Sequence, residues 1–199
     1  MSDSDGDGKS VLVPGGRDVR ATLDAPEGAA CVVACPPHPE MGGSRSDARL
    51  RAVSDALAPA ACLRFDYGPW DEGCGELTDA GNALAWARGR YDRVGLLGFS
   101  FGGAVALLAA AEAAPDSVSA LAPAARLPAG LDAVDALGAI DCPTQVVYGE
   151  RDTTADWEPV VERARELGHR VDALPADHFF VGQERKVADR VAAFHRDHL

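Results

Sequence analysis

Short hydrophobic runs alternate with amphipathic stretches along most of the chain. Continuous apolar runs bounded by Gly, Pro or Asp predict strands that are buried on both faces. The expected strands cover residues 29–34, 61–65, 94–97, 117–122, 144–148 and 169–174. Apolar residues recur at spacings of three and four in the intervals, which predicts helices there. The alternation indicates an α/β fold with a mostly parallel, doubly wound sheet that helices cover on both faces.

The N-terminal part of the chain follows a different pattern. Residues 17–24 alternate polar and apolar side chains, which is typical of a half-exposed edge strand, and residues 11–13 are expected to pair with it as a hairpin. Residues 1–9 are polar and acidic, so we expect a disordered tail there and a single domain over residues 10–199. Because a signal peptide needs basic and then apolar residues at this position, we expect a cytoplasmic protein.

Capping signals and periodicity place the helices more closely. Ser44 or Ser46 is expected to cap a helix that runs to Leu57. Further helices are expected around residues 77–87, 104–114 and 157–167, with an amphipathic helix closing the chain. The connection between the strands at 117–122 and 144–148 is too short for a lid domain, so the carboxyl edge of the sheet should be open.

Composition adds a strongly acidic balance to this picture. Asp and Glu number 31 against 19 Lys plus Arg, which gives a net charge of −12, and Lys9 and Lys186 are the only lysines. A surface of this sign repels nucleic acid and anionic membranes, so we expect neither as a partner. The balance resembles that of proteins from halophilic archaea, and we expect a halophile. An ordinary acidic protein from a GC-rich genome is the alternative.

The five cysteines show neither a disulfide framework nor a metal-ligand pattern. Cys31, Cys35, Cys62 and Cys142 lie in or beside expected strands, which is typical of buried free thiols in a reducing compartment. Cys31 and Cys35 lack a second Cys/His pair at ligand spacing, so we expect no metal site.

One motif stands where the expected strand at 94–97 meets the expected helix at 104–114. Gly98-Phe99-Ser100-Phe101-Gly102 reads G-x-S-x-G, and a strand before it with a helix after it is the context of a nucleophile elbow. The glycines tolerate the tight turn, and the helix N-terminus favours a developing negative charge. We therefore expect Ser100 to be a nucleophile.

A serine hydroxyl needs a base that removes its proton. His178 is the best candidate because it lies in a loop between the last strand and the last helix. His169, His195 and His198 start a strand or lie in the terminal helix, and we expect them at the surface.

The base in turn needs an acid that orients it. Asp152 follows the strand at 144–148 through a short loop that begins with a glycine. The resulting chain order of Ser100, Asp152 and His178 is that of α/β-hydrolases. Glu150 and Asp156 are the alternative acids.

An oxyanion pocket needs two aimed N–H donors. The backbone N–H of Phe101 should be one, and the loop after the strand at 29–34 should supply the other. Three prolines in that loop have no N–H, which leaves Glu40 or Met41, and we favour Glu40. The remaining pocket candidates are His38, Met41, Asp66, Tyr67, Trp70 and Phe179. For His38, fastening the loop by a hydrogen bond is an equal alternative, and the aromatic side chains could instead serve packing.

These motifs together resemble those of the small, lidless α/β-hydrolases grouped near dienelactone hydrolase. The resemblance covers the chain from residue 29 onward and departs from the family pattern at Pro36 and at residues 66–68. It is carried by Pro37-His38-Pro39 with Gly42-Gly43, Arg64-Phe65-Asp66, the motif at 98–102, the Gly149–Asp152 turn and Asp177-His178-Phe179-Phe180.

The resemblance implies an α/β-hydrolase fold without a lid and a serine hydrolase without metal or organic cofactor. Dienelactone hydrolases in the strict sense use a cysteine nucleophile, so Ser100 argues against that reaction. We expect cleavage of a small or exposed ester or thioester, with a small-molecule substrate as the partner and a homodimer left open. A peptidase, an acyltransferase or a non-catalytic binding protein on the same fold are the alternatives.

Overall fold

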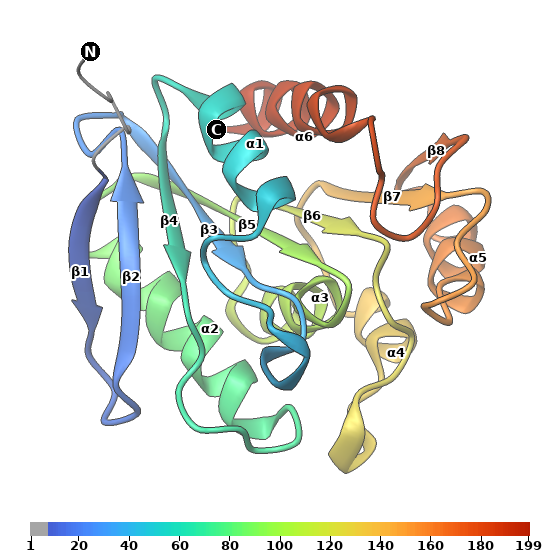
Figure 1. Cartoon of the computed structure of the whole chain (residues 1–199), viewed down its shortest axis with the longest axis horizontal. Coiled ribbons are helices and arrows are strands. Elements are labelled where there is room, and N and C mark those ends of the chain that lie inside the picture. The colour runs from blue at the N-terminus through green and yellow to red at the C-terminus, as the bar shows by residue number, and fades with distance from the viewer. Residues whose placement is uncertain (1–7) are drawn as a thin grey trace.

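A mixed sheet of eight strands runs through the centre of the molecule in a computed structural model that describes residues 8–199 (Figure 1). The strand order is β1-β2-β4-β3-β5-β6-β7-β8. The first two strands are antiparallel to their neighbours, whereas β4, β3 and the strands beyond them are parallel. The strands are β1 Lys9–Val13, β2 Val19–Asp24, β3 Ala30–Cys35, β4 Ala61–Phe65, β5 Arg93–Phe99, β6 Ser117–Leu121, β7 Thr144–Gly149 and β8 Arg170–Leu174.

The N-terminal hairpin is confirmed. Lys9 pairs with Leu23 and Val13 with Val19 in antiparallel register. The expected edge position of residues 17–24 is wrong, because β2 lies between β1 and β4. Lys9, which we expected in the acidic tail, already belongs to β1. Residues 1–7 of that expected tail lie outside the described residues.

Helices cover both faces of the sheet, as expected (Figure 1). α1 Ala48–Leu57 and α6 Glu184–His198 pack side by side on one face. The other face carries α2 Cys74–Arg88, α3 Phe101–Ala113, α4 Ala133–Leu137 and α5 Glu158–Glu166. The short α4 and two 3-10 turns, Pro39–Met41 and Pro128–Gly130, were not expected. No helix within residues 8–199 has the length and hydropathy needed to cross a membrane.

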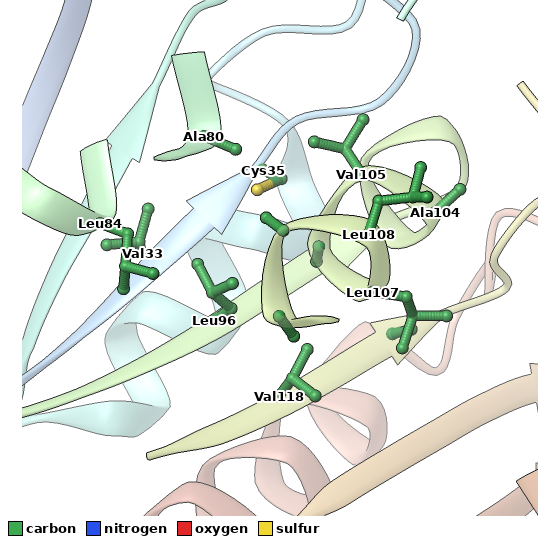
Figure 2. Packing of buried hydrophobic residues seen from close by; sticks show 14 of the residues in the cluster. Val33, Cys35, Ala80, Leu84, Leu96, Ala104, Val105, Leu107, Leu108 and Val118 are labelled. Atoms are coloured by element: carbon green, nitrogen blue, oxygen red, sulfur yellow. The ribbon is translucent and has the colours of Figure 1, made fainter. Parts of the chain in front are cut away.

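The core is built on the alternation of side chains along the central strands. In β3, Val33 points to the layer of α2 and α3, and Val32 to the layer of α1 and α6. Figure 2 shows Val33 and Leu96 of the sheet gathered with Leu84 of α2 and Leu107 of α3. Every residue of α3 from 101 to 110 is buried, so this helix lies in the middle of its layer.

The cysteine prediction agrees with this packing for three of the four residues. Cys31, Cys35 and Cys62 are buried free thiols, whereas Cys142 is half-buried. Burial raises the pKa of Cys31 and Cys35 well above the ordinary thiol value, so both stay protonated. They therefore act as small hydrophobic side chains.

The expected cap of α1 is wrong. Asp47, rather than Ser44 or Ser46, is the N-cap, and its carboxylate accepts from the N–H groups of Arg49 and Leu50 at 2.9 and 3.4 Å. Ser44 accepts from the Ser46 N–H at 3.3 Å instead. An aspartate directly before the first helical residue reaches the free N–H groups and places a negative charge at the positive end of the helix.

The surface assignment of His195 is also wrong. Its side chain is fully buried on α6, and a hydrogen bond of 2.8 Å joins its Nδ1 to Ser117 Oγ. Val187, Val191 and His195 follow one another at intervals of four residues, so all three lie on the buried face of the helix. This spacing is the sequence signal that indicates a buried position for His195.

Candidate active site

Ser100 lies in a strained turn between the last residue of β5 and the first residue of α3. Its φ of 57° and ψ of −119° are unfavourable for a residue with a side chain, and such strain is concentrated at functional sites. A Cβ on Gly98 would clash with the carbonyl of Gly102, and a Cβ on Gly102 would clash with the carbonyls of Cys35 and Pro36. The close backbone approach therefore requires both glycines of the motif.

The structure brings Ser100, His178 and Asp152 together in one chain of hydrogen bonds. Ser100 Oγ lies 3.0 Å from His178 Nε2, and His178 Nδ1 lies 2.7 Å from Asp152 Oδ2. The other oxygen of Asp152 accepts from the N–H groups of Thr154 and Ala155 at 2.8 and 3.1 Å. Because a carboxylate accepts only, Nδ1 carries the proton and Nε2 is left to accept from the serine hydroxyl.

The three side chains differ in burial. The Asp152 side chain is fully buried and that of His178 is 4% exposed, whereas Ser100 is half-buried at a cavity. Each residue follows the carboxyl end of a parallel strand, namely β5, β7 and β8, and this edge is where open α/β sheets place their sites. The alternative acids take no part in this chain of hydrogen bonds: Glu150 is exposed, and Asp156 lines the cavity.

The cavity beside Ser100 has a volume of about 530 Å³, within the usual range for small-molecule sites. His38, Met41 and Phe179, which we expected in the pocket, line it together with Ser100 and Phe101. Further lining comes from Asp47 and Arg49, from residues 124–128 after β6, and from residues 154–156 after β7.

Three expected pocket residues lie outside the cavity lining. Asp66 accepts a hydrogen bond from the Arg45 N–H at 2.7 Å and forms an ion pair with the Arg45 side chain. The Tyr67 hydroxyl donates to Pro36 O at 3.2 Å. The ring of Trp70 lies 4.5 Å from that of His38. Tyr67 and Trp70 thus contact the loop that carries His38 and do not line the cavity.

The structure distinguishes between the backbone N–H groups of that loop, which the sequence left as alternative oxyanion donors. The Met41 N–H donates to His38 O at 3.0 Å, so it is already committed. Glu40 is exposed and does not line the cavity, whereas His38 does. Between the prolines at 36, 37 and 39, His38 contributes the one N–H of that stretch, and it was not among the donors expected from the sequence.

The remaining lining residues were missed for different reasons. The loops after β6 and β7 follow the carboxyl ends of strands, so the edge rule could have found them. Arg49 lies inside a helix, and no motif marks it. Its presence in the cavity depends on how α1 is oriented over the sheet.

The mostly parallel sheet and the serine at a strand–helix elbow define an α/β-hydrolase. The chain belongs to the dienelactone hydrolase family, whose sequence model matches residues 69–197. That match spans Ser100, Asp152 and His178, and the protein is a hydrolase.

Solved structures share this fold across nearly the whole chain. An α/β serine hydrolase without a lid from Xanthomonas campestris is 22% identical, with a TM-score of 0.80 over 96% of this chain and 94% of that one. Dienelactone hydrolase from Anabaena variabilis is 22% identical, with a TM-score of 0.76 over 96% and 97%. Est1E from Butyrivibrio proteoclasticus is 18% identical, with a TM-score of 0.81 over 96% and 98%. Among curated proteins, none matches the chain.

Proposed function

We propose that this hydrolase cleaves a carboxylic ester or thioester through an acyl-enzyme on Ser100. The observation that carries the proposal is the continuous set of hydrogen bonds from Ser100 through His178 to Asp152, with its serine end at a cavity. A nucleophile, a base and an orienting acid in contact are what acyl transfer requires.

Each of the three side chains takes one role in the reaction. His178 Nε2 removes the proton of Ser100 as the hydroxyl attacks the carbonyl carbon, and it then returns that proton to the leaving alcohol or thiol. Asp152 holds the imidazole in the tautomer with Nδ1 protonated and stabilises the imidazolium. Water, activated by the same His178, then hydrolyses the acyl-enzyme.

Two backbone N–H groups hold the oxyanion in this mechanism. One is that of Phe101, the first residue of α3, whose N–H has no acceptor within its own helix. For the other we assign His38 in place of Glu40, because His38 lines the cavity and Glu40 does not.

A proline substitution tests the His38 assignment without changing the backbone angle. His38 has a φ of −54°, which proline also adopts. Relative to His38→Ala, which keeps the N–H, His38→Pro should lower kcat about 10²-fold or more. Equal kcat values in the two variants would return the role to Glu40.

The substrate is expected to be a small-molecule ester or thioester. One solved structure holds ferulic acid bound to Est1E, so a ferulate ester belongs in the substrate panel beside short-chain alkyl esters and thioesters. Amides and amine acceptors in the same panel distinguish a peptidase or an acyltransferase, since both use the same acyl-enzyme.

Labelling with a fluorophosphonate tests the proposal directly. The wild type should react, Ser100→Ala should not, and Ser117→Ala should react like the wild type because Ser117 is fully buried. The reaction should be followed at low and at molar salt, given the acidic surface. Folded wild type that stays unlabelled in both conditions would refute the proposed function.

A further inference from the structure

The loop between β4 and α2 brings Trp70 to the candidate active site without placing it in the cavity lining. Its half-buried ring lies 4.5 Å from the His38 ring and 5.6 Å from the Phe101 ring, centroid to centroid. The His38 and Phe101 rings are themselves 5.0 Å apart. Rings at these separations are in contact. Trp70 therefore contacts both residues whose backbone N–H groups are proposed to hold the oxyanion.

These two residues differ in how their backbone is held. Phe101 is 4% exposed and begins α3, so the turn and the helix fix the position of its N–H. Within residues 8–199, neither the N–H of His38 nor the buried Nδ1 of its imidazole has a hydrogen-bond partner. The His38 carbonyl accepts from Met41 and Gly43 at 3.0 Å, but it belongs to the following peptide unit. The position of the His38 N–H therefore depends on what packs against its ring.

A buried carboxylate of α2 fixes the loop on the N-terminal side of Trp70. The Asp79 side chain is fully buried, and it accepts from the Gly68 N–H at 2.9 Å and from Arg17 Nε at 2.8 Å. Arg17 also donates from Nη2 to the Pro69 carbonyl at 2.6 Å. The two residues that precede Trp70 are therefore both held through their backbone.

A second buried carboxylate fixes the loop on the other side of Trp70. Glu76 is fully buried, and its two oxygens accept from the N–H groups of Asp71 and Gly73 at 3.0 and 2.8 Å. Burying two carboxylates is costly unless they are hydrogen-bonded, and both are satisfied by the loop or by the arginine that binds it. Glu76 and Asp79 thus keep Trp70 in one place relative to α2.

The same loop contacts the segment that leads into His38. The Tyr67 hydroxyl donates to Pro36 O at 3.2 Å, and the Tyr67 ring lies 5.8 Å from that of Phe101. Pro36 O in turn lies close against the nucleophile turn, since a Cβ on Gly102 would be 2.3 Å from it. The β4–α2 loop therefore holds both the start of the His38 loop and the His38 ring itself.

We propose that Trp70 is a positioning residue, which holds the His38 ring so that the His38 N–H points at the oxyanion formed at Ser100. The inference rests on the proposed function, because the oxyanion forms only when Ser100 attacks a carbonyl. Since Trp70 lies outside the cavity lining, its removal should change kcat and not KM. The competing interpretation is that Trp70 only completes the packing of its loop against the core.

Single substitutions at Trp70 separate these interpretations with phenyl butyrate as the substrate. Removing an oxyanion donor costs 10²–10³-fold, so Trp70→Leu, which only displaces one, should lower kcat about tenfold with KM within about threefold. Trp70→Phe keeps a ring and should show a smaller loss. Trp86→Leu is the matched control, because Trp86 is half-buried on α2 and packs against Arg90 away from the cavity. It should change kcat less than about threefold.

A double variant tests whether Trp70 acts through His38. His38→Ala keeps the N–H but removes the ring against which Trp70 packs, so it should also lower kcat about tenfold. His38→Phe should restore most of that loss, since Nδ1 has no partner to lose among residues 8–199. Adding Trp70→Leu to His38→Ala should lower kcat by less than about twofold more, because residues that act as one unit are not additive. This arm does not depend on how stable Trp70→Leu is by itself.

Each outcome separates this inference from the proposed function. If folded Trp70→Leu has lower unfolding stability in urea but the kcat of the wild type, Trp70 only packs, and the hydrolase proposal stands. If the losses of Trp70→Leu and His38→Ala multiply, Trp70 does not act through His38 and the inference is wrong. If folded wild type neither cleaves phenyl butyrate nor reacts with a fluorophosphonate, both proposals fail.

Discussion

Two serine–histidine hydrogen bonds of nearly equal length occur at different places in the molecule. Ser100 Oγ lies 3.0 Å from His178 Nε2 at the carboxyl edge of the sheet, beside a cavity. Ser117 Oγ, on the first residue of β6, lies 2.8 Å from His195 Nδ1 in the core. A short distance between hydroxyl and imidazole therefore does not by itself mark a serine as a candidate nucleophile.

The difference lies in what surrounds each imidazole. His178 has Asp152 on its other nitrogen, whereas the Nε2 of His195 is buried with no hydrogen-bond partner among residues 8–199. Burial, and then the nearby His198, lowers the pKa of His195 from 6.5 to about 3. An imidazole that resists protonation and has no acid beside it cannot serve as a base that must become an imidazolium.

The largest contrast is expected between the two serines. Ser100→Ala should lower kcat by about 10⁵-fold or more, because no nucleophile remains. Ser117→Ala should leave kcat within about threefold, since Ser117 contacts no part of the cavity. Steady-state hydrolysis of phenyl butyrate measures both. A large loss of kcat in Ser117→Ala with its fold intact would show that the buried pair participates in the reaction.

Removing the carboxylate of Asp152 should make the Ser100–His178 pair resemble the Ser117–His195 pair. Asp152→Asn should lower kcat about 10⁴-fold, because the amide neither holds the correct tautomer nor stabilises the imidazolium. Glu150→Gln, at an exposed carboxylate two residues away, is the matched control and should change kcat little. Comparable losses in the two variants would contradict the assignment of Asp152.

The buried imidazole should appear in the pH dependence of stability. Since the pKa of His195 is about 3 in the folded chain and 6.5 unfolded, its neutral form contributes stability above pH 6.5 that is lost as the pH falls. Between pH 6.5 and 4 the free energy of unfolding should fall by up to about 1.4 kcal/mol per pH unit from this group. Urea unfolding of wild type and His195→Asn measures it, and parallel pH profiles would contradict it.

A smaller effect is expected when a methyl group is added beside the Ser117–His195 pair. A Cβ on Gly95 would lie 2.9 Å from both His195 Nδ1 and Ser117 Oγ, so Gly95→Ala should cost about 1–3 kcal/mol of stability with kcat unchanged. Gly81→Ala is the control, because a Cβ at this position in α2 meets nothing within 4 Å and should be neutral or stabilising. Equal unfolding free energies for the two variants would show that the pair adapts to the added methyl group.

Local sequence patterns were sufficient to predict the site residues that follow the carboxyl ends of the strands. A continuous apolar run is sufficient to indicate a buried strand, and parallel strands bring their carboxyl ends to one edge. That reasoning selected Ser100, His178 and Asp152, three residues that the structure joins by hydrogen bonds. It failed for Asp66, Tyr67 and Trp70, whose loop follows the same edge but lies outside the cavity lining.

By itself, then, the sequence determined the order of the strands and of the longer helices, the turn at Ser100 and the edge at which the candidate functional loops gather, because periodicity and turn chemistry act over a few residues. Only the tertiary structure decided that β4 lies between β2 and β3 and that Arg49 enters the cavity. These depend on which faces pack together across long chain separations. The physical reason is that the neighbours of a residue depend on how the layers pack together, and not on any single segment of the chain.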